Sequence, residues 1–323
     1  MTLAPDSLGP TVTVGEILVE IVATTVGDGF RAAQPLIGPY PSGAPAIFID
    51  QCGRFGGQAA LVGAVGRDDF GTVTLDRLCR DGVDVSAVAV DADYPTGSAF
   101  VRYRADGSRD FVYNIATSAA ARFDWSPRVQ ALIERAGHLH VMGTALTMPS
   151  AAKVIARALP ILRARGGTLS FDPNLRKELP LPPATLTQFA DLVGQADLLL
   201  PSGDELDRAA GVKGEARALT TLFGRGVKEI VVKRGAEGAS VFTPEGGRID
   251  APAFRVTEVD PTGAGDCFGG AYVAARRLGL GTQQALAYGC AAGARNVAVR
   301  GPMEGTGTRA ELDEFMRNTP QRV

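Results

Sequence analysis

The pattern of apolar and polar positions along the chain predicts strands that alternate with helices. Apolar and β-branched residues dominate 11–22, which predicts one long strand after a Pro-, Gly- and Ser-containing start that we expect to be frayed. The stretch 35–45 contains four prolines and is predicted to be a loop. Helical patterns at 46–55 and 72–81 flank an apolar run at 60–65 that is typical of a buried strand.

The same alternation continues to the C-terminus. It predicts strands at 138–142, 168–172, 198–200 and 229–233, helices at 151–165, 185–194 and 215–223, a hairpin over 240–249, and small-residue helices from Asp266 onward. Strands that alternate with helices form a mostly parallel sheet covered on both faces. Ligands of such sheets bind beyond the carboxyl ends of the strands. We expect one large domain over residues 11–317.

One segment departs from this alternation. Residues 96–114 contain two β-type runs joined by Ala105-Asp106-Gly107-Ser108, and an Asp-Gly pair between such runs is a strong hairpin signal. A hairpin that interrupts an α/β chain predicts a flap or lid built of strands.

Composition narrows the class of protein. The 35 acidic and 33 basic residues give a net charge of −2 without long runs of one sign, which argues against a nucleic-acid or membrane-surface partner. The four cysteines are far apart and form no CxxC pair, so a zinc site or a disulfide framework is not expected. With no secretory or membrane-spanning pattern, we expect a soluble cytoplasmic protein.

The candidate chemistry lies in the segment RVTEVDPTGAGDCFGGAYV, residues 255–273. Its glycines allow a close backbone turn, and the amides of Gly263, Ala264 and Gly265 are placed at the start of a helix, where anions bind. Asp266 adds a carboxylate that can take a proton beside this anion site. A phosphate cradle beside a base is the arrangement that phosphoryl transfer requires.

The stretch DPTGAGDCFGGAY resembles the C-terminal signature of the ribokinase-like sugar kinases, the PfkB family. The resemblance implies that Asp266 is the catalytic base and that the amides of Gly263, Ala264 and Gly265 form the anion hole. It also implies a three-layer α/β/α domain with a mostly parallel sheet and a small β-strand lid, built from about 15–40 and 96–114. Pro261 replaces a residue that is usually threonine in the family.

The same resemblance assigns the sugar-binding end. GEILVE ends in Glu20, where the family has an acid for sugar hydroxyls, and Gly43 keeps one glycine of a sugar-contacting loop. Ile47 stands where the family has an asparagine, which hints at a subfamily with its own substrate. The segment DPNLR resembles a DPN-x-R motif and assigns Asn174 and Arg176 to the substrate, with Arg176 placed to reach a phosphate or an acidic sugar group.

The nucleotide end also follows from the resemblance. PSGDE matches an N-x-x-E segment, so Glu205 is expected to organise Mg²⁺ through water, although Ser202 replaces the asparagine. The resemblance assigns Lys233, Gly235 and Gly238 to the nucleotide loop, and it also assigns Ser202 and Gly265 to the nucleotide. Cys290 is expected to line the wall beside adenine. Asp260 and Thr262 are expected to bind a monovalent cation such as K⁺.

These assignments imply ATP-dependent phosphorylation of a primary hydroxyl of a small sugar. The stretch after Phe111 contains no Arg or Lys to hold a sugar carboxylate, which favours a neutral ketohexose such as tagatose or fructose. Arg176 keeps 2-keto-3-deoxygluconate as the alternative substrate. A non-catalytic sugar or nucleotide sensor on the same fold is the alternative of another class. Family lids also form dimer contacts, so we expect a homodimer through the lid.

Overall fold

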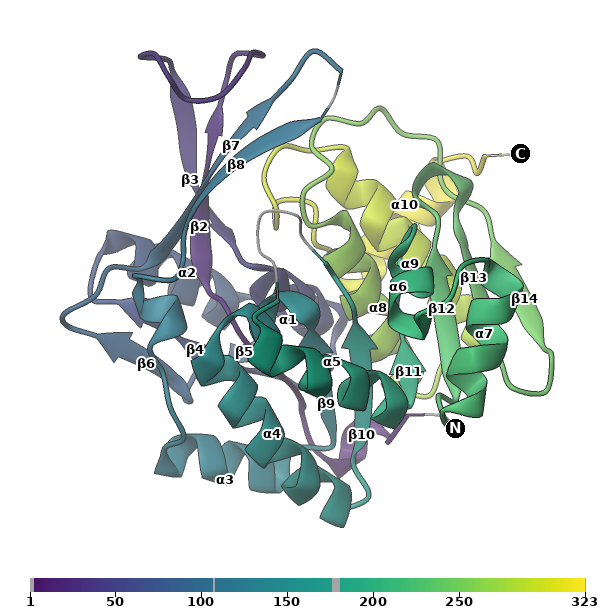
Figure 1. The fold of residues 1–323 in the computed structure, drawn as a ribbon. Coiled ribbons are helices and arrows are strands. Elements are labelled where there is room, and N and C mark those ends of the chain that lie inside the picture. The colour runs from purple at the N-terminus through teal and green to yellow at the C-terminus, as the bar shows by residue number, and fades with distance from the viewer. Residues whose placement is uncertain (1–2, 107, 176–180, 323) are drawn as a thin grey trace.

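The computed structural model describes residues 3–106, 108–175 and 181–322. A ten-stranded main sheet runs through the centre of the molecule (Figure 1). Its strands are β1 (Thr11–Val14), β4 (Ala59–Gly66), β5 (Val83–Asp84), β6 (Val88–Asp91), β9 (His138–Met142), β10 (Thr168–Asp172), β11 (Leu198–Leu199), β12 (Glu229–Lys233), β13 (Ala239–Phe242) and β14 (Arg248–Ala251).

The main sheet is parallel except at one edge. Its order is β14-β13-β12-β11-β10-β9-β1-β4-β5, with β6 also paired to β4, and only the pairs β12–β13 and β13–β14 are antiparallel within the described residues. All eight residues of β4 are buried, with Ala60 and Val62 in one hydrophobic core and Leu61 and Val65 in the other. Burial on both faces explains why this strand has an unbroken apolar sequence.

Helices cover both faces of the main sheet. One core includes residues of α3 (Pro127–Arg135), α4 (Pro149–Ala164), α5 (Pro183–Gln195), α6 (Glu205–Ala210) and α7 (Glu215–Gly224). The other includes residues of α1 (Ala44–Phe55), α2 (Asp69–Arg80), α8 (Ala264–Arg277), α9 (Thr282–Val297) and α10 (Arg309–Asn318). The expected three-layer α/β/α architecture is confirmed.

A second sheet, which we call the small sheet, projects from this body (Figure 1). It consists of β2 (Leu18–Ala23), β3 (Leu36–Ser42), β7 (Gly97–Tyr103) and β8 (Arg109–Asn114), in the order β3-β2-β7-β8. Strands β7 and β8 are the hairpin expected at 96–114, paired from Ser98 opposite Asn114 to Tyr103 opposite Arg109.

Two sequence predictions about this region are wrong. The single strand expected at 11–22 is broken at Gly15–Ile17, so β1 lies in the main sheet and β2 in the small sheet. All residues from 11 to 20 are buried, so the apolar pattern continues through the break and does not show where one strand ends and the next begins. The loop expected at 35–45 contains β3, and its prolines are tolerated because β3 is an edge strand.

The chain start is also more ordered than expected. Residues 6–8 form a 3₁₀ turn, and Leu3 is buried. The buried guanidinium of Arg277 on α8 donates to the carbonyl oxygens of Ala4, Pro5 and Gly9. These contacts hold the first residues against the helix that begins at the candidate site. In the described part of the chain, the helices are too short or too polar to cross a membrane.

Candidate active site

The site is organised by the first turn of α8. Gly263 is the N-cap residue with φ of 82°, a left-handed conformation that favours glycine, and its carbonyl accepts from the Cys267 amide at 2.8 Å. Asp266 follows in the first helical turn and is buried. The predicted combination of helix N-terminus and carboxylate is therefore present.

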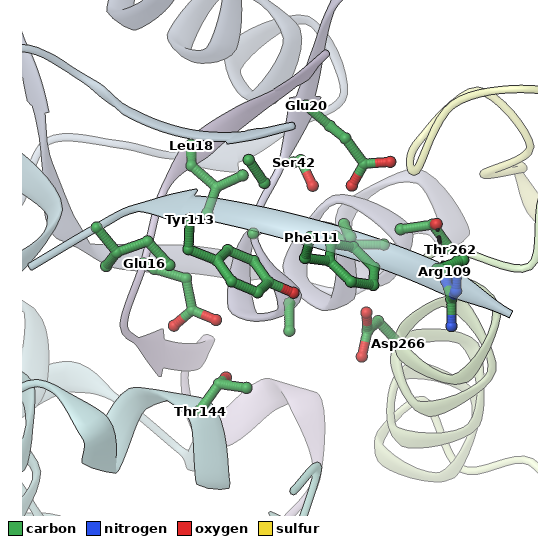
Figure 2. A pocket seen from close by; sticks show the side chains of 15 residues that line it. Glu16, Leu18, Glu20, Ser42, Arg109, Phe111, Tyr113, Thr144, Thr262 and Asp266 are labelled. Atoms are coloured by element: carbon green, nitrogen blue, oxygen red, sulfur yellow. Dashed lines mark hydrogen bonds between the residues drawn. The ribbon is translucent and has the colours of Figure 1, made fainter. Parts of the chain in front are cut away.

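Two pockets meet at this turn. The carboxylate pocket is lined by Asp266 together with Glu16, Glu20, Ser42, Gly43, Ile47, Arg109, Phe111, Tyr113, Thr144 and Thr262, among others (Figure 2). The glycine pocket is lined by Ala264 and Gly265 together with Ser202, Lys233, Gly235, Gly238, Phe268, Cys290 and Gly293, among others. One helix N-terminus thus presents its carboxylate to one pocket and its backbone to the other.

The small sheet forms one wall of the carboxylate pocket. Arg109, Phe111 and Tyr113 alternate along β8, so all three side chains face the pocket. The Phe111 and Tyr113 rings are stacked with centroids 5.2 Å apart, and the Arg109 guanidinium lies 5.4 Å from the Phe111 centroid. This row provides apolar ring faces and one cation to a small ligand.

Contacts connect the tip of the small sheet to the loop before α8. Arg109 Nη1 donates to Thr262 Oγ1 at 3.0 Å, and the Tyr103 hydroxyl donates to Asp260 Oδ1 at 2.5 Å. Asp260 is buried and also accepts from the backbone amides of Thr262 at 2.9 Å and Gly301 at 3.0 Å. Burial and the Asp260 carboxylate raise the pKa of Tyr103 well above its usual value, so this hydroxyl remains a donor.

A buried ion pair lies at the wall of the glycine pocket. Lys233 Nζ is 2.5 Å from Asp172 Oδ2, and a Cβ on Gly265 would lie 3.5 Å from the same Nζ. Burial raises the pKa of Asp172 to about 7 despite Lys233. Burial lowers the pKa of Lys233, but Asp172, Glu205 and Asp266 outweigh this effect and raise it above its usual value. Lys233 therefore remains a cation beside the helix N-terminus.

The segment after β10 supports the carboxylate of Asp266. Asn174 has φ of 36° and donates from Nδ2 to Asp266 Oδ1 at 3.2 Å, while its amide donates to Asp172 Oδ1. The structure therefore places Asn174 against the candidate base. Arg176, predicted to contact substrate, lies outside the described residues.

Glu205 is held in place by protein donors. Its Oε2 accepts from the amide and the hydroxyl of Ser202, both at 2.8 Å, and its Oε1 accepts from the Leu175 amide at 2.9 Å. Within the described residues, no group of three or more His, Cys, Asp and Glu side chains is placed to hold a metal by itself. Any Mg²⁺ here would need water and phosphate oxygens as its other ligands.

The glycine pocket contains the residues predicted to bind a nucleotide. Ser202, Lys233, Gly235, Gly238, Gly265 and Cys290 all line it. Burial raises the pKa of the Cys290 thiol to about 12, so it remains a neutral, weakly polar wall residue. Phe254, Phe268 and Val297 add apolar surface suited to the face of a base.

Asp260 and Thr262, predicted to bind a monovalent cation, take part in hydrogen bonds that join two loops. The Asp260 carboxylate accepts from the Gly301 amide, and Asn296 Nδ2 donates to the Thr262 carbonyl at 2.8 Å. Asn296 Oδ1 accepts from the Gly305 amide at 3.2 Å. The loops before α8 and before α10 are thus connected at this position by a carboxylate and an amide side chain.

Sequence reasoning missed several residues of the site, among them four with polar or charged side chains. Glu16, Arg109 and Thr144 line the carboxylate pocket, and Tyr103 contacts the loop before α8. The sequence could have indicated Arg109, because the alternation of side chains along the predicted hairpin places Arg109 on the same face as Phe111 and Tyr113. Asp50 and Gln51, the polar residues that follow Ile47 on α1, do not replace the asparagine lost at Ile47, because both are buried and bond to the loop around Thr306 and Gly307.

Comparisons with known proteins agree with this geometry. Residues 11–309 match the model of the pfkB family carbohydrate kinases. Fructokinase-1 of Oryza sativa subsp. japonica is 32% identical over 318 residues, which cover 95% of this chain and 97% of the relative. The 2-dehydro-3-deoxygluconokinase of Thermoproteus tenax is 32% identical, with 95% and 94% covered. The structure of a putative Ribokinase II from E. coli, in complex with ATP and Mg²⁺, is 40% identical, superposes with a TM-score of 0.89, and covers 96% of this chain and 99% of its own.

Proposed function

Because the chain belongs to the pfkB family of carbohydrate kinases and is therefore a sugar kinase, we propose that it transfers the γ-phosphoryl group of ATP to a primary hydroxyl of a small neutral sugar. One observation supports this assignment above the others. The first turn of α8 lies between two pockets, with Asp266 lining one and Ala264 and Gly265 lining the other. A hydroxyl in the carboxylate pocket and a phosphate in the glycine pocket would meet at this turn.

The proposed roles follow from these positions. Asp266 takes the proton of the sugar hydroxyl, whose oxygen bonds to the γ-phosphorus as ADP leaves. The amides of Gly263, Ala264 and Gly265 hold the developing negative charge at the helix N-terminus. Asn174 holds the base through its hydrogen bond to Asp266 Oδ1. Lys233 contributes a fixed positive charge on the nucleotide side.

We propose that ATP occupies the glycine pocket, and the structure of the 40%-identical E. coli protein in complex with ATP and Mg²⁺ supports ATP as the nucleotide. Ser202, Gly235 and Gly238 would contact its polar parts, and Cys290 its base. Glu205, fixed by its three donors, would orient water around Mg²⁺. When bound, Mg²⁺ neutralises charge on the phosphates.

A monovalent cation such as K⁺ is proposed at the Asp260–Thr262 loop. The Thr262 carbonyl has two lone pairs, of which Asn296 uses one. Because Asp260 and Asn296 already join the two loops, we propose that K⁺ adjusts the helix start rather than being required for it.

The charges of the carboxylate pocket favour a neutral sugar. Arg109 bonds to Thr262 at the end near the start of α8, whereas Glu16 and Thr144 lie at the opposite end (Figure 2). A sugar acid that presents its terminal hydroxyl to Asp266 would place its carboxylate toward Glu16, where like charges repel. Glu20 and Gly43 contribute an acceptor and close backbone to a polyol. We therefore propose a fructose- or tagatose-like ketohexose, with 2-keto-3-deoxygluconate as the second candidate.

Assembly and location are proposed on separate grounds. The small sheet exposes Leu36, Ile37 and Val112, which are 44%, 39% and 47% exposed, and we propose that a second copy of the chain covers them. The four cysteines are free and three are buried, which fits a reducing cytoplasm.

The proposal is tested by ADP release with Mg-ATP across tagatose, fructose, psicose, ribose and 2-keto-3-deoxygluconate, with and without K⁺. We expect one neutral ketohexose to be preferred and Asp266→Asn to lose at least about 100-fold in kcat, since the general base is removed. Near-normal turnover of Asp266→Asn would remove the proposed base. Preference for 2-keto-3-deoxygluconate would overturn the charge argument, and ATP binding without any turnover would favour a sensor.

A further inference from the structure

Arg109, on strand β8 of the small sheet, places a positive charge at the end of the carboxylate pocket where Asp266 lies (Figure 2). Arg109 Nη1 bonds to Thr262 Oγ1 at 3.0 Å, and Thr262 immediately precedes the N-cap residue Gly263. Figure 2 shows Arg109 and Thr262 at the same end of the pocket as Asp266. Among the lining residues that the structure describes, Arg109 is the only basic one in this pocket.

A second residue fixes the position of this cation. Tyr103 and Arg109 are opposite each other in the β7–β8 register, so they form one cross-strand pair at the tip of the small sheet. The Tyr103 hydroxyl donates to Asp260 Oδ1 at 2.5 Å, two residues before the partner of Arg109. One cross-strand pair therefore contacts both ends of the Asp260–Thr262 loop.

The carboxylates around the reacting atoms favour a cation at this position. Glu16, Glu20 and Asp266 are buried carboxylates of the same pocket. A phosphoryl group that crosses toward a sugar in this pocket spreads negative charge over its oxygens, and it approaches these acids. The amides of Ala264 and Gly265 and the Lys233 side chain lie on the nucleotide side, and among the described residues Arg109 is the basic one that lines the sugar side. A planar guanidinium with five donors suits a phosphate, and Thr262 takes one of them.

We propose that Arg109 is a further catalytic residue that contacts the phosphoryl group during transfer, and that Tyr103 positions it. The inference rests on the proposed kinase function. Arg109 exchanges no proton: the sugar oxygen–phosphorus bond forms, the bond from the γ-phosphorus to ADP breaks, and the proton goes to Asp266. Since the pair belongs to the small sheet, the transfer site is complete only when this sheet lies over the pocket.

The test compares Arg109→Gln and Arg109→Lys with Arg104→Gln in the full chain. Arg104 is a matched control because its ion pair with Asp110 lies at the exposed tip of the same hairpin. We expect Arg109→Gln to lower kcat by about 100-fold with little change in the KM for sugar, as for loss of a transition-state donor. Arg109→Lys should recover part of this loss, and Arg104→Gln should retain wild-type kcat.

A binding measurement separates this inference from the proposed function. Mg-ADP with aluminium fluoride and the preferred sugar mimics the phosphoryl group in transfer, and calorimetry reads its affinity without turnover. Arg109→Gln should weaken this complex by a factor similar to its loss in kcat, while Mg-ADP alone binds as in the wild type. A raised KM with unchanged kcat would instead make Arg109 a sugar ligand and overturn the inference. If the wild type phosphorylates no sugar, the proposed function fails, whatever Arg109 does.

Tyr103 is tested by additivity. We expect Tyr103→Phe to lower kcat by about 10-fold while the KM for ATP stays unchanged, and Tyr40→Phe, whose ring packs on Gly301, is the control. Because Tyr103 acts through Arg109, the Tyr103→Phe/Arg109→Gln double variant should be no slower than Arg109→Gln. Losses that multiply in the double variant would show that Tyr103 does not position Arg109.

Discussion

Two glycines at the start of α8 have different physical reasons to be glycine. Gly263 has φ of 82°, and a Cβ there would lie 2.4 Å from the Pro302 carbonyl oxygen. Gly265 lies in the first helical turn, and the nearest atom to its added Cβ is Lys233 Nζ at 3.5 Å, an ordinary contact. The fold therefore requires the first glycine, while the space beside the second is where a phosphate would approach.

Alanine at these positions should separate folding from function. We expect Gly263→Ala to lower the free energy of unfolding by more than about 2 kcal/mol, because left-handed strain adds to a backbone clash. Gly265→Ala should unfold at or slightly above the wild-type denaturant concentration, since alanine favours a helix, yet lose about 100-fold in kcat/KM for ATP. Urea unfolding and initial rates measure both. A Gly265→Ala enzyme with wild-type ATP kinetics would contradict the anion hole.

At the scale of elements, a buried ionic network connects α1 and α2 to the loop before α10. Arg77 on α2 donates to the Met303 carbonyl at 2.6 Å and to Thr306 Oγ1 at 3.0 Å, and it pairs with Asp81 at 2.5 Å. Asp50 on α1 accepts from Thr306 Oγ1 at 2.8 Å and lies 3.6 Å from Arg77. This loop contacts Asp260 and Gly263, so the network stabilises the loop that packs against the start of α8.

Asp50 should give the stability a pH dependence of defined sign. Burial raises its pKa from 3.8 to about 7, which exceeds the lowering by Arg77. The native state then keeps a proton that the unfolded chain releases, so this contribution is complete below pH 4 and is lost as the pH rises through 7. Since each pKa unit is worth about 1.4 kcal/mol, the loss is at most about 4 kcal/mol.

The measurement compares wild type with Asp50→Asn by urea unfolding at pH 5, 6.5 and 8. Asparagine cannot titrate, and Arg77 retains Asp81 and Glu304 as partners. We expect the variant to gain about 2 to 3 kcal/mol relative to wild type between pH 5 and pH 8, because part of the contribution is already lost below pH 5. The opposite trend would mean that attraction by Arg77 exceeds the effect of burial.

The sequence predicts most strands of the main sheet and the β7–β8 hairpin of the small sheet, but it misses β3 and the break between β1 and β2. Strands β4, β9, β10 and β12 are predicted because burial on both faces leaves a continuous apolar run. Strand β3 is missed because its prolines favour a loop, and an edge position that tolerates them is known only from the tertiary structure. Within the site, the helix-start chemistry is local and can be predicted, whereas the Tyr103–Asp260 contact joins residues 157 positions apart.

At the scale of the molecule, the two sheets have different surroundings. The main sheet is covered by helices on both faces, while the small sheet turns one face to the carboxylate pocket and leaves apolar side chains exposed on its strands. Strand β8 has one side chain in each of these two surroundings, since Phe111 lines the pocket and Val112 is 47% exposed. A sheet of this kind gains stability when a second copy covers the outer side chains.

The proposed dimer through the small sheet predicts a change in mass on substitution. We expect the wild type to sediment at about twice the chain mass of 33.6 kDa at micromolar concentration, and Val112→Asp to shift it to the monomer, since a charge would be buried in the interface. Val90→Asp is the matched control, because Val90 on β6 is 49% exposed but lies in the main sheet. The monomeric variant should also show a raised KM for sugar, because the small sheet that closes the pocket loses its support. A wild type that sediments as a monomer, or two variants that behave alike, would contradict dimerisation through the small sheet.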